Sequence, residues 1–255
     1  MMRKLLKNII AYTGFELRRR RQHVPGDHNA PVGSMEELLA GVKKRGLPCK
    51  NMLDIGANKA EWSFLFKTVY PNANCIMIEP LTDCEPEMAK FVQQYPGSKY
   101  VLCAAGSVNT ESVITVWDDL YGSSLLPATD EQKLSKGNQR RITVRKMDDL
   151  LQENNIAVPE IVKIDVQGFE LEALKGASSL FGKTELFILE VSLYEFDDVP
   201  GMPEFYDVID FMYQRGYVVY EFPGFLRRPY DGALGQCDVA FVKKNGFLRK
   251  SNKWK

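Results

Sequence analysis

The fold is decided by the segment LDIGANKA at residues 53–60, in which an apolar strand turns into a helix. Asp54 lies near the end of this strand, and Gly56 followed by the small Ala57 permits a tight turn and close approach of a ligand. The dinucleotide fingerprint G-x-G-x-x-G is absent, because the turn holds a single glycine and offers no evident cradle for a pyrophosphate. The segment therefore favours a cofactor without phosphates. The structural alternative is an ordinary turn in which Asn58 caps the helix.

Apolar strands alternate with helical patterns on both sides of this turn. The predicted strands lie at residues 51–55, 74–78, 100–104, 161–164 and 186–189, and the predicted helices at 62–70, 82–95, 168–180 and 203–215. Such alternation indicates right-handed βαβ units and a doubly wound, mostly parallel α/β sheet. Two further pairs are predicted to be antiparallel: 113–117 with 141–145, and 217–221 with 238–242. In a sheet of this kind, ligands bind at the carboxyl ends of the strands.

Acidic residues follow several of these strands. Glu79 closes the second strand, where a carboxylate can accept hydrogen bonds from both hydroxyls of a ribose. The alternative is a carboxylate placed near a helix start because the helix dipole favours it. The segment KIDVQGFE at residues 163–170 and Glu190 place more carboxylates at two other strand ends. These could act as a base, orient a hydroxyl or hold a divalent cation. The alternative is helix capping together with a lysine salt bridge.

The motifs LDIGANKAEWS, IEP, YGSSLL, KIDVQGFELEALKGA and LEVS, between residues 53 and 192, resemble those of the FkbM-type methyltransferases, which use S-adenosylmethionine (SAM). The resemblance extends over roughly residues 50–245. It implies a Rossmann-like, class I SAM-methyltransferase sheet of seven strands, of which the last is antiparallel. It also implies SAM as methyl donor and an oxygen nucleophile on the acceptor. One position departs from the family pattern, which has glycine where this chain has Ala60.

Carried over by position, the resemblance assigns residues to two parts of a site. The SAM site would be lined by Asp54, Gly56, Ala57, Asn58 and Glu79. The reaction centre would be bordered by Asp165, Gln167, Gly168 and Glu170, and Gln167 and Glu170 are candidates for binding the acceptor. The loop at residues 118–139 is long enough for a lid or an acceptor-binding loop, which makes Ser123 and Ser124 further candidates. The alternative for this loop is a mobile connection.

Methyl transfer to a hydroxyl needs a base near the nucleophile. Both histidines, His23 and His28, lie in a linker, so Asp165 or Glu190 is the candidate catalytic base. No metal ligands are assigned, and a divalent metal is compatible with the carboxylates but not required. The family resemblance implies that the acceptor is a hydroxyl on a glycan or a secondary metabolite. The alternatives are a non-catalytic SAM-binding module in a glycan-assembly complex and a nicotinamide-dependent oxidoreductase, which the missing glycines disfavour.

The charge distribution divides the chain into a basic amphipathic helix with a linker at 1–33, a catalytic domain at 34–246 and a basic tail at 247–255. Residues 1–22 hold seven Lys and Arg against one Glu, and residues 243–255 hold six and no acid. The whole sequence has 33 basic and 33 acidic residues, which argues against a dedicated nucleic-acid binder. The N-terminal helix is predicted to contact an anionic membrane peripherally through residues 1–22. Its alternative is packing on the domain or on a second subunit.

The remaining features of the sequence concern its compartment. No segment approaches the ~20 apolar residues of a membrane span. Five cysteines without a CxxC pair predict reduced, structural thiols. The predicted location is the cytoplasm, with the inner face of the membrane as an alternative.

Overall fold

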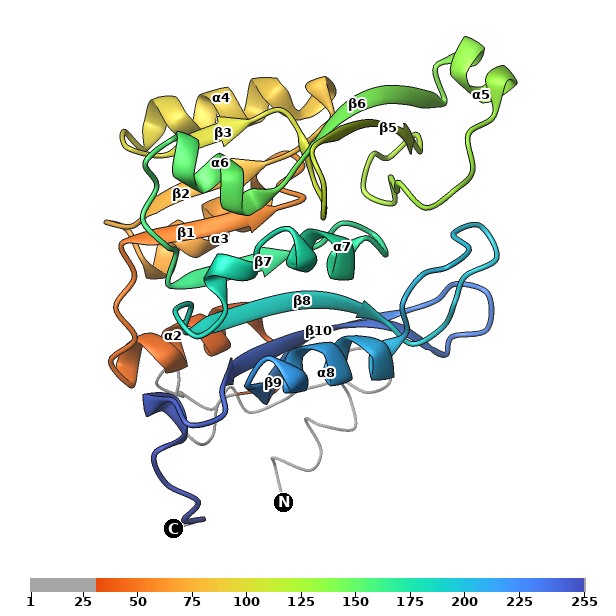
Figure 1. Cartoon of the computed structure of the whole chain (residues 1–255). Helices are drawn as coiled ribbons and strands as arrows, with labels where there is room; N and C mark the ends of the chain where they lie inside the picture. The colour runs from red at the N-terminus through yellow and green to blue at the C-terminus, as the bar shows by residue number, and fades with distance from the viewer. Residues whose placement is uncertain (1–30, 255) are drawn as a thin grey trace, which may run out of the picture.

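A seven-stranded sheet forms the centre of the molecule in a computed structural model that describes residues 31–254 (Figure 1). The strand order is β3-β2-β1-β7-β8-β10-β9, and only β10 runs antiparallel to the rest. Its strands are β1 (Asn51–Ile55), β2 (Asn74–Ile78), β3 (Lys99–Val101), β7 (Ile161–Ile164), β8 (Leu186–Ser192), β9 (Tyr217–Arg227) and β10 (Leu234–Lys243). This architecture confirms the predicted doubly wound α/β sheet with seven strands and an antiparallel last strand.

Helices cover both faces of the sheet, and each face has its own hydrophobic core. One face packs against α2 (Met35–Lys44), α3 (Glu61–Val69) and α4 (Glu85–Gln94), and the other against α6 (Met147–Glu153), α7 (Glu170–Lys175) and α8 (Phe205–Gln214). Strand β8 illustrates the division, because Leu186 and Ile188 enter the first core while Phe187 and Leu189 enter the second. Residues 186–189 of this strand are all apolar because they are buried on both faces of the sheet, which is why the sequence pattern predicts a strand there.

A second, three-stranded sheet with the order β4-β6-β5 lies beside the first. It consists of β4 (Ala104–Ala105), β5 (Thr110–Thr115) and β6 (Gln139–Arg145). The antiparallel pairing predicted for 113–117 and 141–145 is confirmed, since Val113 lies opposite Arg141. The single strand predicted at 100–104 is wrong. The Cys103 N–H donates to the Val101 carbonyl, so the chain turns there and passes from β3 into β4 of the other sheet.

Short helical segments account for the other differences from the sequence patterns. The helix predicted at 168–180 is divided at Gly176 into α7 and the 3₁₀ segment η2 (Ser178–Leu180). Helices α5 (Glu131–Lys136) and α6 were not predicted. The 3₁₀ segments η1 (Thr82–Cys84) and η3 (Phe247–Arg249) complete the described elements. All five cysteines lie in the described part of the chain and are free thiols, as predicted.

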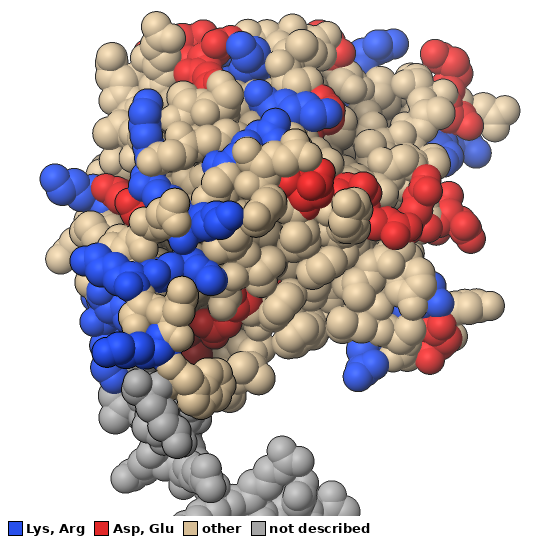
Figure 2. Space-filling view, turned by 60° about the horizontal axis from the view of Figure 1, so that its bottom comes forward, with Lys and Arg blue, Asp and Glu red and all other residues tan. Residues whose placement is uncertain are grey.

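Basic side chains gather at the end of the sheet where the parallel strands begin (Figure 2). Here the C-terminal segment lies against β9 and α8, with the Arg249 guanidinium donating to the Val219 carbonyl and the Lys244 ammonium 4.7 Å from the centre of the Tyr213 ring. The predicted N-terminal helix and its membrane contact through residues 1–22 lie outside the described residues. Within residues 31–254, no helix has the length and apolar character needed to cross a membrane.

Gly56 fixes the closest approach between β1 and β7. Its φ of +78° lies in the left-handed region, and a Cβ built on it would lie 1.8 Å from the Asp165 carbonyl oxygen. The Gly56 N–H donates to the Ile78 carbonyl of β2, and the Asp165 N–H donates to the Ile55 carbonyl of β1. A side chain at residue 56 would therefore separate strands that are joined by hydrogen bonds.

We expect Gly56→Ala to lower the free energy of unfolding by about 2–4 kcal/mol, from left-handed strain plus a backbone clash. Gly137 is the matched control, because its φ is +80° and a Cβ there would meet nothing within 4 Å. Gly137→Ala should cost only about 1 kcal/mol. Urea unfolding of the two variants measures the difference, and equal losses would contradict the packing argument.

Candidate active site

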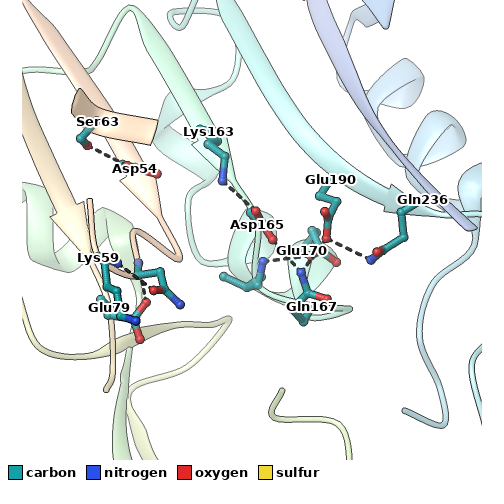
Figure 3. Close-up of polar contacts among 12 residues, drawn as sticks. Asp54, Lys59, Ser63, Glu79, Lys163, Asp165, Gln167, Glu170, Glu190 and Gln236 are labelled. Carbon is teal, nitrogen blue, oxygen red and sulfur yellow. Dashed lines mark hydrogen bonds and ion pairs between the residues drawn. The ribbon is translucent and has the colours of Figure 1, made fainter. Parts of the chain in front are cut away.

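Carboxylates from four neighbouring strands meet at the carboxyl ends of the parallel strands (Figure 3). They are Asp54 of β1, Glu79 after β2, Asp165 after β7 and Glu190 of β8. They meet because parallel strands all end at the same edge of the sheet, although the residues are far apart in the sequence. The prediction that the residues after each strand form one site is consistent with this arrangement.

Glu79 joins the turns that follow β1 and β2. It is 5% exposed and accepts hydrogen bonds from the N–H of Asn58 at 2.9 Å and the N–H of Leu81 at 3.0 Å, one on each carboxylate oxygen. Burial raises its pKa to about 7, against the lowering effect of these two bonds. A carboxylate has room for about four hydrogen bonds, so Glu79 can accept two more from a ligand.

The turn after β1 takes an unusual backbone path. Asn58 and Ala60 both adopt left-handed conformations, with φ of +45° and +62°. Left-handed backbone at Ala60 is the conformation that glycine prefers, which accounts for glycine at this place in the family pattern. Asn58 does not cap the helix. Its side chain accepts from the Lys59 N–H, and α3 begins after Ala60 without a side-chain cap.

Asp54 lies behind this turn. It is fully buried, and its Oδ2 accepts a hydrogen bond of 2.7 Å from the Ser63 hydroxyl of α3. Its Oδ1 has no hydrogen-bond partner among residues 31–254, and burial raises the pKa of the carboxyl. Asp54 thus connects α3 to β1 and has one carboxylate oxygen without a hydrogen bond next to the turn. The role of Asp54 in binding a cofactor stays a prediction.

A buried lysine lies among the carboxylates of the sheet. Lys163 of β7 has an 8% exposed side chain, and its ammonium lies 2.9 Å from Asp165 Oδ2. The register places Lys163 beside Asp54 on β1, and Glu190 and Asp238 follow on the same face across β8 and β10. Burial alone would lower the pKa of Lys163, but Asp165 and Asp54 raise it above its usual range. Lys163 is therefore a permanent cation in this site.

Gln167 connects the two candidate catalytic carboxylates. Its side-chain amide donates to Asp165 Oδ1 at 2.9 Å and to Glu190 Oε2 at 2.6 Å. The turn is held by Glu170, whose Oε1 accepts from the N–H groups of Val166 and Gly168. These bonds keep Gln167 in a left-handed conformation, with φ of +51°. Glu170 is 4% exposed and burial raises its pKa to about 7, so its observed role is to support the turn.

The charges on Asp165 and Glu190 differ because of Lys163. Burial would raise the pKa of Asp165, but the adjacent ammonium lowers it below the usual range. Glu190 has no such partner, and burial together with the negative charge of Asp165 raises its pKa to about 9. It accepts hydrogen bonds only from the amides of Gln167 and Gln236, the latter at 3.0 Å, among the described residues. The adjacent ammonium thus favours the ionised form of Asp165, whereas burial next to that negative charge favours the protonated form of Glu190.

Two cavities meet at this site. The first is narrow, about 60 Å³, and lies between Glu79, the strand β4 and the loop at residues 120–125. The second, about 330 Å³, lies between α3 and the ends of β7, β8 and β10, and its walls include Trp62, Lys163, Glu190 and Asp238. Gly56, Asn58, Tyr121 and Asp165 line both cavities. Asp165 is therefore the carboxylate shared by the two spaces.

The two predicted serines lie on the loop that covers the first cavity. Ser123 lines the cavity. Ser124 is fully buried, and its hydroxyl donates to the Gln167 carbonyl at 2.7 Å, so it fixes the loop to the turn beside Asp165. Tyr121 belongs to the same loop. Its hydroxyl donates to Glu61 and so connects the loop to α3. Binding of an acceptor by Ser123, Ser124, Gln167 and Glu170 stays a prediction.

Several residues of the site were not identified from the sequence. Trp62 lines the second cavity, and its indole N–H has no partner among residues 31–254. Gln236 and Asp238 reach the site from β10, on the face that carries Glu190. The sequence does contain a signal for Gln236 and Asp238, because they are polar residues at alternate positions of a buried strand. Only the strand pairing shows which groups they face. Within the described chain, no three His, Cys, Asp or Glu side chains are grouped as metal ligands.

Comparisons with known proteins identify relatives of this chain. The model of the family described as "Methyltransferase FkbM domain" matches residues 54–219. Hexuronic acid methyltransferase AglP of Haloferax volcanii is 25% identical over 138 residues, which is 54% of each chain. Methyltransferase sdnD of Sordaria araneosa is 24% identical over 153 residues, which is 49% of this chain and 59% of the relative. This chain thus spans about half the length of the curated relatives it matches.

Solved structures that match this chain include a 1,6-didemethyltoxoflavin-N1-methyltransferase of Burkholderia thailandensis. The two chains have 12% identity and a TM-score of 0.46, and the match covers 81% of this chain and 76% of that one.

The raised pKa of Glu190 predicts a pH-dependent effect of Glu190→Gln. Between about pH 5 and 9 native Glu190 keeps its proton while the unfolded chain releases it, so the wild type loses up to about 1.4 kcal/mol of stability per pH unit from this group. The neutral glutamine has no such loss. We therefore expect the free energy of unfolding of Glu190→Gln, minus that of the wild type, to increase from pH 5 to 8 in urea titrations. A difference independent of pH would mean that native Glu190 is ionised.

Proposed function

The chain belongs to the FkbM methyltransferase family, and we propose that it transfers the methyl group of SAM to a hydroxyl oxygen of a glycan or of a secondary metabolite. We favour a glycan. One relative is named for methylating a hexuronic acid, which is a sugar. The single observation that carries the proposal is the position of Asp165, an ionised carboxylate that lines both cavities of the site.

The residues around the turn that follows β1 have the chemical groups needed to bind SAM. Glu79 has lone pairs left for the two ribose hydroxyls, and the Gly56 turn offers no phosphate cradle, which SAM does not need. Trp62 lines the second cavity, and its indole N–H, which is buried and has no partner among residues 31–254, is the kind of donor that a carboxylate such as that of the methionine part could take up. When bound, SAM supplies an electrophilic methyl group. The first cavity is narrower than SAM, and the loop at residues 120–125 forms one of its walls.

Asp165 is the base in the proposed mechanism. With SAM bound, it would accept the proton of the acceptor hydroxyl as the oxygen–methyl bond forms and the methyl–sulfur bond breaks. The products would be a neutral ether, S-adenosylhomocysteine as the leaving group and a protonated Asp165. Lys163 and the Gln167 amide hold the carboxylate in place on two sides, at 2.9 Å each. Protonated Glu190 can donate a hydrogen bond to the acceptor or to Asp165 and so orient the pair. General base catalysis of this kind typically contributes about 10²–10⁴-fold.

The first test concerns SAM binding by Glu79. We expect Glu79→Gln to weaken SAM about ten- to a hundredfold, because the amide cannot accept both ribose hydroxyls. Glu79→Ala is a poorer choice, since it would also leave two backbone N–H groups without a partner. Because its pKa is raised to about 7, wild-type affinity should rise between pH 6 and 8, and the variant should lack this dependence.

Calorimetry measures both effects. The control is Glu87→Gln, which removes an exposed carboxylate on the adjacent helix α4. Unchanged SAM affinity in Glu79→Gln would refute the ribose assignment.

The second test distinguishes the two candidate bases. With Asp165 as the base, kcat/KM for the acceptor, measured at saturating SAM, should be level between pH 6 and 8. Asp165→Asn should lose at least about a hundredfold in transfer of tritiated methyl groups. With Glu190 as the base, the rate would instead rise about tenfold per pH unit toward pH 9 and would be lost in Glu190→Gln. SAM affinity and thermal unfolding of each variant control for folding, since Asp165→Asn leaves Lys163 without its carboxylate. Retained SAM binding without transfer by the wild type would favour the non-catalytic binding module.

A further inference from the structure

A groove lies next to the carboxylate site, outside both cavities. It has a volume of about 570 Å³ and is lined by residues 196–198 and 226–230 together with Gly235 and Gln236. We call it the hairpin groove. Its walls are the loop after β8 and the hairpin between β9 and β10, which extend side by side beyond the end of the sheet in Figure 1. The Leu193 N–H donates to the Gly235 carbonyl and so joins the two walls.

The hairpin groove is continuous with the reaction centre through Gln236. This residue lines the groove, and its side-chain amide donates to Glu190 Oε2. In the register of β8 and β10, Glu190 lies opposite Asp238, and Gln236 lies two residues further toward the hairpin. Two residues of a strand span about 7 Å. A molecule with its reactive hydroxyl beside Asp165 and Glu190 would therefore place its adjoining part in the groove.

Aromatic and guanidinium planes form the surface of the hairpin groove. The Arg228 guanidinium is held by Asp231 through two hydrogen bonds of 2.7 and 2.6 Å, and it lies 4.0 Å from the centre of the Tyr194 ring. Tyr194 in turn stacks with Phe196. Tyr230 is 91% exposed at the mouth of the groove, with the Arg228 guanidinium 5.7 Å from its ring centre. An exposed tyrosine next to a fixed planar group offers a flat face with a polar edge.

Charged groups of both signs border these planes. Asp197, Asp198 and Arg227 line the groove, and Arg227 also donates to the Gly232 carbonyl of the hairpin. Carboxylates and guanidinium groups accept from and donate to neighbouring hydroxyls. A pyranose ring has an apolar C–H face and a rim of hydroxyls, which matches a flat aromatic surface bordered by such groups. Two aspartates and two arginines line the groove, and Arg228 is paired with Asp231, so no excess of positive charge favours a phosphate backbone.

We propose that the hairpin groove binds a sugar ring of the acceptor, adjacent to the sugar whose hydroxyl is methylated, with the ring stacked on Tyr230. This inference rests on the proposed function in that it takes the hydroxyl to lie beside Asp165. It adds to that function a glycan of at least two sugars as the acceptor. It also assigns Tyr230 and the border of Asp197, Asp198 and Arg227 to its recognition.

The test uses binding and transfer with defined disaccharides. Cellobiose, mannobiose and digalacturonic acid are each added to the full-length protein with saturating S-adenosylhomocysteine, and binding is followed by saturation-transfer NMR. We expect at least one disaccharide to bind, Tyr230→Ala to weaken it at least about tenfold, and Tyr230→Phe to retain it because the ring face remains. Tyr206→Ala is the control, since this tyrosine of α8 is 75% exposed outside the groove. S-adenosylhomocysteine affinity should be the same in all variants.

The possible outcomes distinguish sugar binding in the hairpin groove from methyl transfer at the carboxylates. Binding of no disaccharide to the wild type, or binding that Tyr230→Ala leaves unchanged, would overturn the assignment of the groove. Binding that depends on Tyr230, without any transfer of tritiated methyl groups to the bound disaccharide or to longer glycans that contain it, would uphold the groove and refute the proposed transferase activity. Comparison of the acidic with the neutral disaccharides shows whether Arg227 or the aspartates select the sugar.

Discussion

The ion pair between Lys163 and Asp165 is the interaction on which the site depends. An ammonium group this deeply buried is tolerated only with a carboxylate beside it, because removing a charge from water costs several kcal/mol. The pairing keeps Asp165 ionised, and the negative charge of Asp165 then helps to keep the proton on Glu190. The surroundings thus shift the pKa values of two chemically similar carboxyl groups in opposite directions. Such a division is what general acid–base chemistry at neutral pH requires.

Close backbone contacts and buried hydrogen bonds fix the backbone around Lys163 and Asp165. Gly56 lets the first strand turn pass directly against the Asp165 carbonyl, and Glu79 ties the same turn to the end of β2. Gln167 reaches both carboxyl groups only because its backbone is left-handed, and the Glu170 carboxylate stabilises that turn. Strained conformations concentrated at one edge of a sheet, and held by buried hydrogen bonds, are typical of functional sites.

The molecule has different chemistry at its two ends. The carboxylates, both cavities and the hairpin groove lie where the parallel strands end, and basic side chains gather where those strands begin (Figure 2). A surface or partner of negative charge that contacts the basic end would leave the site and the groove open. The fold thereby places the basic surface and the carboxylate site at opposite ends of the sheet.

The sequence by itself determined the strands, the order of βα units and the residues that end each strand, because burial on both faces and the change from strand to helix leave local patterns. It also identified Asp165, Gln167, Glu190 and Glu79, since polar residues directly after apolar strands are conspicuous. It could not determine that β3 ends at Val101, that Asn58 leaves the helix uncapped, or that Gln236 and Asp238 face Glu190. Nor could it show that Lys163 lowers the pKa of Asp165 while burial raises that of Glu190. These depend on which strands are neighbours and on how far each group is from water and from Lys163, and both are properties of the tertiary structure alone.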